Sequence, residues 1–95
     1  MEQCVNLDSY KDEVWNKAIK YDGYDPREMR KDIMGLYIKY KHYGRKTDFG
    51  WVIDFIVPLD RGGSGKLENM QPLHWQNKRY RDVKRDLSEP QLSDY

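Results

Sequence analysis

Residues 51–58 read WVIDFIVP, a short and almost wholly apolar run that ends at a proline. A run of this length and composition predicts a β-strand that is covered on both faces and stopped by Pro58. Asp54 interrupts the apolar sequence, and a carboxylate that is even half-buried needs a partner. Asp54 is therefore the first residue to consider as part of a site.

The sequence downstream of this strand continues as loop, strand and helix. Residues 59–69, LDRGGSGKLEN, hold three glycines in four positions and predict a loop. MQPLH at 70–74 predicts a short returning strand. From His74 to about Asp86 the sequence favours a helix, with Trp75 and Val83 as its buried positions. The order predicted for this half of the chain is strand, loop, strand and helix.

The first half of the chain predicts a helix and a further strand. Ser9 and Asp12 have the spacing of a capping box, and a helix is expected from about Tyr10 to Tyr21. Its apolar face would hold Val14, Trp15, Ala18 and Ile19. Asp25 and Pro26 favour a short turn of helix. Alternation from Leu36 to Tyr40 indicates a strand. We expect an α+β fold with one domain over residues 1–87 and a flexible acidic tail over 88–95.

Composition limits what such a chain can do. Of its 95 residues 38% are hydrophobic and 35% charged, which predicts one small domain with a thin core. The net charge of +1 hides a basic stretch, KRYRDVKR at 78–85, and an acidic one, LSEPQLSDY at 87–95. The single cysteine, Cys4, makes no internal disulfide. No signal peptide or membrane span is visible, so we expect a cytoplasmic protein.

Residues 51–79, WVIDFIVPLDRGGSGKLENMQPLHWQNKR, resemble the HNH endonuclease family, and more specifically its small stand-alone members from bacteria and phages. GYDPREMRKDIMG at 23–35, followed by YG at 43–44 and GW at 50–51, also resembles this subgroup. The resemblance covers roughly Val14 to Lys84. It implies a ββα-metal core with an N-terminal helix and an additional strand or hairpin, in a protein of a bacterial cell or its phage.

The resemblance also implies four site positions, of which two are altered. Asp54 matches the metal-binding Asp, and Asn69 matches the Asn that holds the loop. Phe55 stands where the general-base His is expected, and Lys78 stands at the metal ligand of the helix. Phe cannot accept a proton, and loss of a general base lowers rates by roughly 10²–10⁴. A protonated Lys has donors only and cannot bind a metal. No cofactor is expected, and Mg²⁺ or Mn²⁺ only if residual nuclease activity exists.

Three neighbouring residues allow more than one interpretation. Lys78 pairs either with Asp54, in the place of the metal, or with Asp82 four residues on along the helix. His74 is interpreted as scaffold rather than as a replacement base or ligand. Asn77 precedes Lys78 by one residue, about 100° around a helix, and should point elsewhere.

The sequence therefore indicates a non-catalytic, HNH-like pseudonuclease that acts by binding. Its partner would be a protein, such as a host defence nuclease blocked by a phage or mobile element, or else DNA or RNA. The alternative is a metal-dependent endonuclease that cleaves DNA through an altered site. Whether the two substitutions are natural or engineered stays open. The candidate phosphate contacts are Arg79, Arg81, Lys84 and Arg85. The candidate partner contacts are Tyr37, Lys39, Tyr40, Tyr43 and Arg45.

Overall fold

The centre of the fold is an antiparallel hairpin. The computed structural model describes residues 6–88, and in it β3 (Trp51–Phe55) pairs with β4 (Met70–His74). The register sets Trp51 opposite His74 and Asp54 opposite Gln71. Because side chains alternate along a strand, Trp51 and Ile53 point to one face and Asp54 to the other. Both strands lie where they were predicted, although β3 ends three residues before Pro58.

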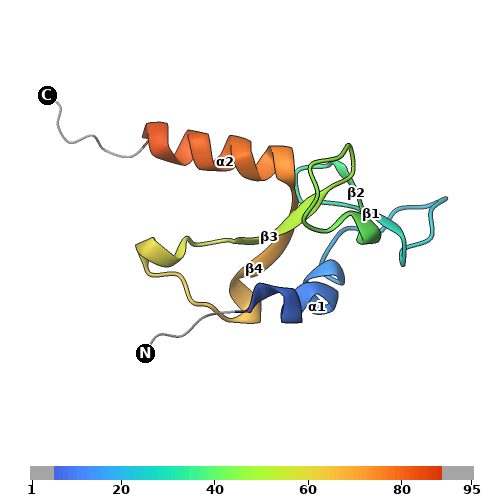
Figure 1. The fold of residues 1–95 in the computed structure, drawn as a ribbon, viewed down its shortest axis with the longest axis horizontal. Coiled ribbons are helices and arrows are strands. Elements are labelled where there is room, and N and C mark those ends of the chain that lie inside the picture. The colour runs from blue at the N-terminus through green and yellow to red at the C-terminus, as the bar shows by residue number, and fades with distance from the viewer. Residues whose placement is uncertain (1–5, 89–95) are drawn as a thin grey trace, which may run out of the picture.

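The hairpin lies between two helices (Figure 1). The helix α2 (Trp75–Ser88) follows β4 without a loop and packs on β3 and β4, while α1 (Lys11–Trp15) packs on β4 from the other side. Trp51, Ile53 and Met70 join Val14 and Trp15 in the main core. Asp54 therefore lies on the face that α2 covers, and the main core lies on the opposite face.

The predicted N-terminal helix is much shorter in the structure. A 3-10 turn (Leu7–Tyr10) precedes α1, which ends at Trp15, and the next backbone bonds are tighter ones from Lys17 to Val14 and from Ala18 to Trp15. The prediction of a capping box at Ser9 was wrong, because the Ser9 hydroxyl donates to the Asn6 carbonyl oxygen at 2.8 Å and caps no helix. Ile19, predicted to be buried, instead forms a β-bridge with Lys31 and is 43% exposed.

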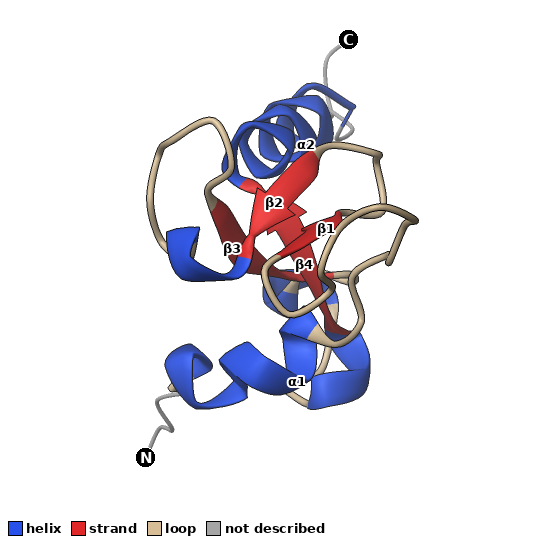
Figure 2. Ribbon diagram, turned by 90° about the vertical axis from the view of Figure 1, so that its right-hand side faces the viewer, coloured by secondary structure: helices blue, strands red, loops and turns tan. Residues whose placement is uncertain are grey.

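A second, smaller antiparallel sheet stands beside the hairpin (Figure 2). It pairs β1 (Met29–Lys31), which was not predicted, with β2 (Tyr37–Lys39) in the predicted strand. The buried Arg30 of β1 donates to the carbonyl oxygens of Pro26 at 2.7 Å and Trp15 at 3.2 Å. This guanidinium fastens the sheet to the end of α1. The described residues thus form an α+β fold with two α-helices and two small antiparallel sheets.

Several local predictions need correction. His74 is the last residue of β4, so the helix begins at Trp75 and His74 does not share its face with Lys78. Val83, expected to be buried, is 51% exposed, and Trp75 is half-buried. The short helical turn predicted at Asp25 and Pro26 is present, since the amides of Glu28 and Met29 both donate to the Asp25 carbonyl oxygen at 2.9 Å. Cys4 and residues 89–95 of the predicted tail lie outside the described residues, while Ser88 ends α2.

Candidate functional site

Asp54 is a buried carboxylate in the middle of the site. Its residue exposure is 1%, because β4 lies beside it and α2 lies over it. Its cross-strand neighbour Gln71 donates from Nε2 to Oδ2 at 2.9 Å. An ionised carboxylate in such a place requires positive charge as well as neutral donors.

Two cations from α2 supply that charge. The Lys78 Nζ lies 3.2 Å from Asp54 Oδ1, and the Arg81 guanidinium donates from Nη1 to Oδ2. Residues three apart on a helix share a face, which brings both side chains to one carboxylate. The Lys78 contact satisfies the ion-pair distance but not hydrogen-bond geometry, so Oδ1 lacks a directed hydrogen bond. Lys78 therefore acts on Oδ1 mainly through charge.

Lys78 has both of the partners that the sequence suggested. Its ammonium also donates to Asp82 Oδ1 at 3.0 Å, one turn further along α2. Asp82 also forms an ion pair with Arg85, whose Nη2 lies 3.3 Å from Asp82 Oδ1. The ammonium thus lies between two carboxylates, one from β3 and one from α2.

Arg81 is the site residue that the sequence reasoning missed, since it was assigned to phosphate binding. Besides Asp54 it donates to the carbonyl oxygens of Phe55 at 3.2 Å and Ile56 at 2.6 Å. One guanidinium therefore holds the carboxylate and the end of its strand together. The i,i+3 spacing from Lys78 was the signal in the sequence that placed Arg81 on the same face.

Phe55 turns away from the carboxylate. Its half-buried ring packs against the main core on the α1 side of the hairpin. Strand alternation explains this, because neighbouring side chains point to opposite faces. The position expected to supply a general base therefore supplies core packing.

Asn69 pins the loop between the two strands. This buried side chain donates from Nδ2 to the carbonyl oxygens of Val57 at 2.9 Å and Ser64 at 2.7 Å, and its Oδ1 accepts the Val57 amide at 2.9 Å. A Cβ at Gly63 would lie 1.8 Å from the Val57 oxygen and 2.8 Å from Asn69 Nδ2. The loop passes too closely here for any residue other than glycine.

His74 belongs to a separate buried network. Its Nε2 lies 2.8 Å from the Asp48 carbonyl oxygen, and its Nδ1 accepts the Gln76 amide at 3.0 Å. Both ring nitrogens are occupied, so the geometry fits scaffold. The buried carboxylate of Asp32 accepts the His74 amide and the Asn77 side chain, each at 2.9 Å. Asn77 thus points away from Asp54, as its place on the helix indicated.

The candidate contact residues divide into engaged and exposed groups. On α2, Arg79 and Lys84 are exposed, whereas Arg81 and Arg85 are partly buried and form the ion pairs described above. In the other group Arg45 is exposed, and Tyr37 is exposed although its ring packs 5.1 Å from the Tyr21 ring.

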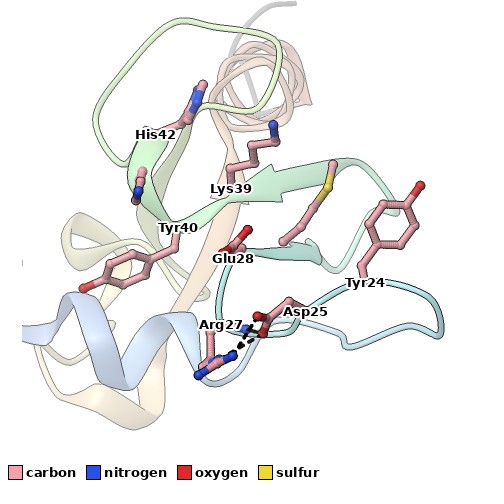
Figure 3. Close-up of a pocket in the computed structure, with 9 residues that line it drawn as sticks. Tyr24, Asp25, Arg27, Glu28, Lys39, Tyr40 and His42 are labelled. Carbon is pink, nitrogen blue, oxygen red and sulfur yellow. Dashed lines mark hydrogen bonds and ion pairs between the residues drawn. The ribbon is translucent and has the colours of Figure 1, made fainter.

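The remaining tyrosines and Lys39 are tied to neighbouring groups. Tyr43 Oη donates to Asp8 at 2.8 Å, and Tyr40 Oη donates to Asp12. Burial and the Asp8 hydrogen bond raise the Tyr43 pKa to about 12. Lys39 Nζ lies over the Phe49 ring at 4.6 Å. Lys39 and Tyr40 also line a hollow of about 440 Å³, where Tyr40 points toward α1 (Figure 3).

The residues around Asp54 do not fit a divalent metal ion. Within residues 6–88 no cluster of three or more His, Cys, Asp or Glu side chains could hold one. Asp54 itself faces two cationic side chains, which would repel a divalent ion.

Within residues 6–88, none of the helices has the length and apolar character that crossing a bilayer requires.

Comparisons with protein-family models, curated proteins and solved structures returned no significant match.

Proposed function

We propose that this chain is a non-catalytic HNH-like protein that acts by binding, and that Lys78 and Arg81 take the place of a divalent ion beside Asp54. The observation that carries the proposal is the buried Asp54 carboxylate with an ammonium at 3.2 Å and a guanidinium donating to its other oxygen. Both cations come from the strand-facing side of α2. They neutralise the carboxylate without any bound ion.

Electrostatics argue against a metal in this arrangement. Two unit charges 4 Å apart interact by about 4 kcal/mol near a protein surface, so a divalent ion would meet about 8 kcal/mol of repulsion from each of the two cations, against a similar attraction to the one Asp54 carboxylate. Phe55 packs in the core and offers no proton acceptor. Hydrolysis would therefore lack both the activating ion and the base that the family resemblance implies.

A protein partner is favoured over nucleic acid by the state of the basic helix. Of four candidate phosphate contacts, Arg81 and Arg85 form ion pairs with Asp54 and Asp82. Arg79 and Lys84 are exposed. Phosphate binding rests on the number of cations available to release counterions, so a reduced set predicts weak DNA binding with a shallow salt dependence. A host nuclease blocked by this chain is one form that a protein partner would take.

Plasmid nicking with Mg²⁺ or Mn²⁺ tests the proposal. The variant is Phe55→His with Lys78→Asn and Arg81→Gln, because restoring the first two positions alone would leave Arg81 on Asp54. The matched control is Arg79→Gln, an exposed cation on the same helix. We expect wild type and control to be inactive and to bind no Mn²⁺ in calorimetry, and the triple variant, which lacks both cations beside Asp54, to gain Mn²⁺ binding. Nicking by wild type that disappears in Asp54→Ala would instead establish the endonuclease alternative.

A further inference from the structure

An open hollow of about 500 Å³ is lined by α2, β3 and the loop that precedes β3. We call it the α2 hollow. Its apolar floor consists of Val52 from β3 with Trp75 and Val83 from α2. Trp75, Arg79 and Val83 recur every four residues, which places them along one face of the helix. Val83 is 51% exposed although its spacing predicts burial, so this face of α2 presents apolar surface that the fold itself does not cover.

The Trp75 side of the α2 hollow is held in one conformation. The indole N–H donates to the Thr47 carbonyl oxygen at 2.6 Å, and the ring stacks on His74 with the ring centroids 6.1 Å apart. A Cβ at Gly50 would lie 1.7 Å from the Arg45 oxygen and 3.1 Å from Trp75 Cδ1, so the loop passes close against the indole. A side chain fixed in this way loses little conformational entropy when a partner binds to it.

Four charged side chains also line the α2 hollow, three of them positive and one negative. Lys78 and Asp82 pair with each other at 3.0 Å. Lys46 and Arg79 are exposed, and neither forms an ion pair with another residue in the range 6–88. The lining therefore has an excess of two positive charges beside its apolar floor. A complementary surface would carry two negative charges beside an apolar side chain.

We propose that the α2 hollow binds an acidic segment of a protein partner. An aliphatic side chain of that segment lies on the apolar floor, and its carboxylates lie beside Lys46 and Arg79. Apolar burial supplies affinity, while complementary charge speeds association and fixes the register of the segment. A nucleic-acid strand fits this hollow less well, because its backbone offers sugar and phosphate rather than an aliphatic group and its affinity grows with the number of cations available.

This inference rests on the proposed function, because it specifies where the proposed protein partner binds. The probe is a fluorescein-labelled heptapeptide with a central leucine, two glutamates on each side of it and a serine at each end. Fluorescence anisotropy with the full chain should show saturable binding that weakens as salt rises. The Trp75 indole signal should shift in NMR spectra of the same titration. Nicking by wild type would refute the proposed function, whereas failure to bind this peptide would refute only the present inference.

Substitutions in the α2 hollow locate the binding. Lys46→Glu and Arg79→Glu should each weaken peptide binding by about tenfold, since each loses one ion pair and adds a repulsion of similar size. Val83→Asp should weaken it by about tenfold through the lost apolar contact. Lys20→Glu is the matched control, because Lys20 is exposed, does not line the hollow and gives the same change in net charge. Circular dichroism should show that all four variants are folded.

Three results would overturn the inference: wild type does not bind the glutamate peptide up to about 1 mM, a peptide with glutamine in place of glutamate binds equally well, or Lys20→Glu weakens binding as much as Arg79→Glu does. A strand of ten thymidines provides the remaining comparison. If the strand binds more tightly than the peptide and Arg79→Glu abolishes that binding, the α2 hollow is a nucleic-acid site and the inference is wrong.

Discussion

Replacing Arg81 with glutamine probes the contact on which the proposed function rests. Gln and Arg have similar helix propensities, so the substitution removes the guanidinium with little effect on α2 itself. The variant loses the donation to Asp54 and the two hydrogen bonds to the carbonyl oxygens of Phe55 and Ile56. Lys78 and Gln71 remain in contact with the carboxylate.

The expected loss follows from these three bonds. A hydrogen bond to a charged group contributes about 1.5–3 kcal/mol, and each carbonyl bond about 0.5–1.5 kcal/mol. Discounting for the 31% exposure of the Arg81 side chain leaves about 3 kcal/mol. For a domain of this size, each kcal/mol lowers Tm by about 4–8 °C, so the variant should melt about 12–24 °C below wild type.

Urea unfolding followed by tryptophan fluorescence gives the free energy directly, since Trp15 and Trp51 lie in the core. Arg79→Gln is the control and should change stability by no more than about 0.5 kcal/mol. A double-mutant cycle with Asp54→Asn should show a coupling of about 1–3 kcal/mol between the two residues. If Arg81→Gln unfolds at the same urea concentration as Arg79→Gln, the guanidinium does not stabilise Asp54, and the argument for a built-in cation fails.

Three further substitutions test other parts of the structure. Asn69→Ala removes three loop contacts and should lower stability by about 2–4 kcal/mol, measured by urea unfolding; a loss below about 1 kcal/mol would show that the loop is held otherwise. Asp32→Ala removes four hydrogen bonds and should speed amide exchange in both the 32–36 turn and the start of α2; exchange that rises in the turn alone would contradict the link between them. The pKa of the Tyr43 hydroxyl is raised to about 12, so the protonated hydroxyl and its hydrogen bond to Asp8 stabilise the fold fully below pH 10. This stabilisation disappears as the pH rises toward 12. Stability curves of wild type and Tyr43→Phe should therefore converge over that range, and parallel curves would contradict the assignment.

The elements with strong local signals were predictable from the sequence. WVIDF and MQPLH formed β3 and β4, and the basic stretch after His74 formed α2, because apolar runs and turn residues determine such elements locally. β1 was missed because its sequence, MRK, has no apolar alternation. It is a strand through its pairing with β2 and Ile19. The N-terminal helix ended early for a similar reason, since Ile19 forms that bridge instead of a further turn.

The resemblance to a family motif, rather than the residues alone, singled out Asp54, Asn69 and Lys78. In the structure Lys78 lies 3.2 Å from Asp54, which was one of its two expected partners, and Asn69 holds the loop. Arg81 was missed because a cation on a basic helix is equally suited to phosphate or carboxylate, and only the packing of α2 on β3 selects between them. Tyr40 and Tyr43 were expected to offer contact surface, but α1 and its preceding turn provide acceptors for both hydroxyl groups.

The outer edge of β4 has a consequence for how copies of this chain can meet. A strand with free backbone groups on one side invites another strand to pair with it, which leads to fibrous aggregates. Here the Met70 oxygen is bound by Lys17, Pro72 has no N–H to donate, and the His74 amide is bound by Asp32. At each of these three outward-facing positions at least one backbone group is therefore unavailable to another strand. Another strand that approached this edge would therefore find too few free backbone groups for a regular ladder, which protects the hairpin against edge-to-edge aggregation.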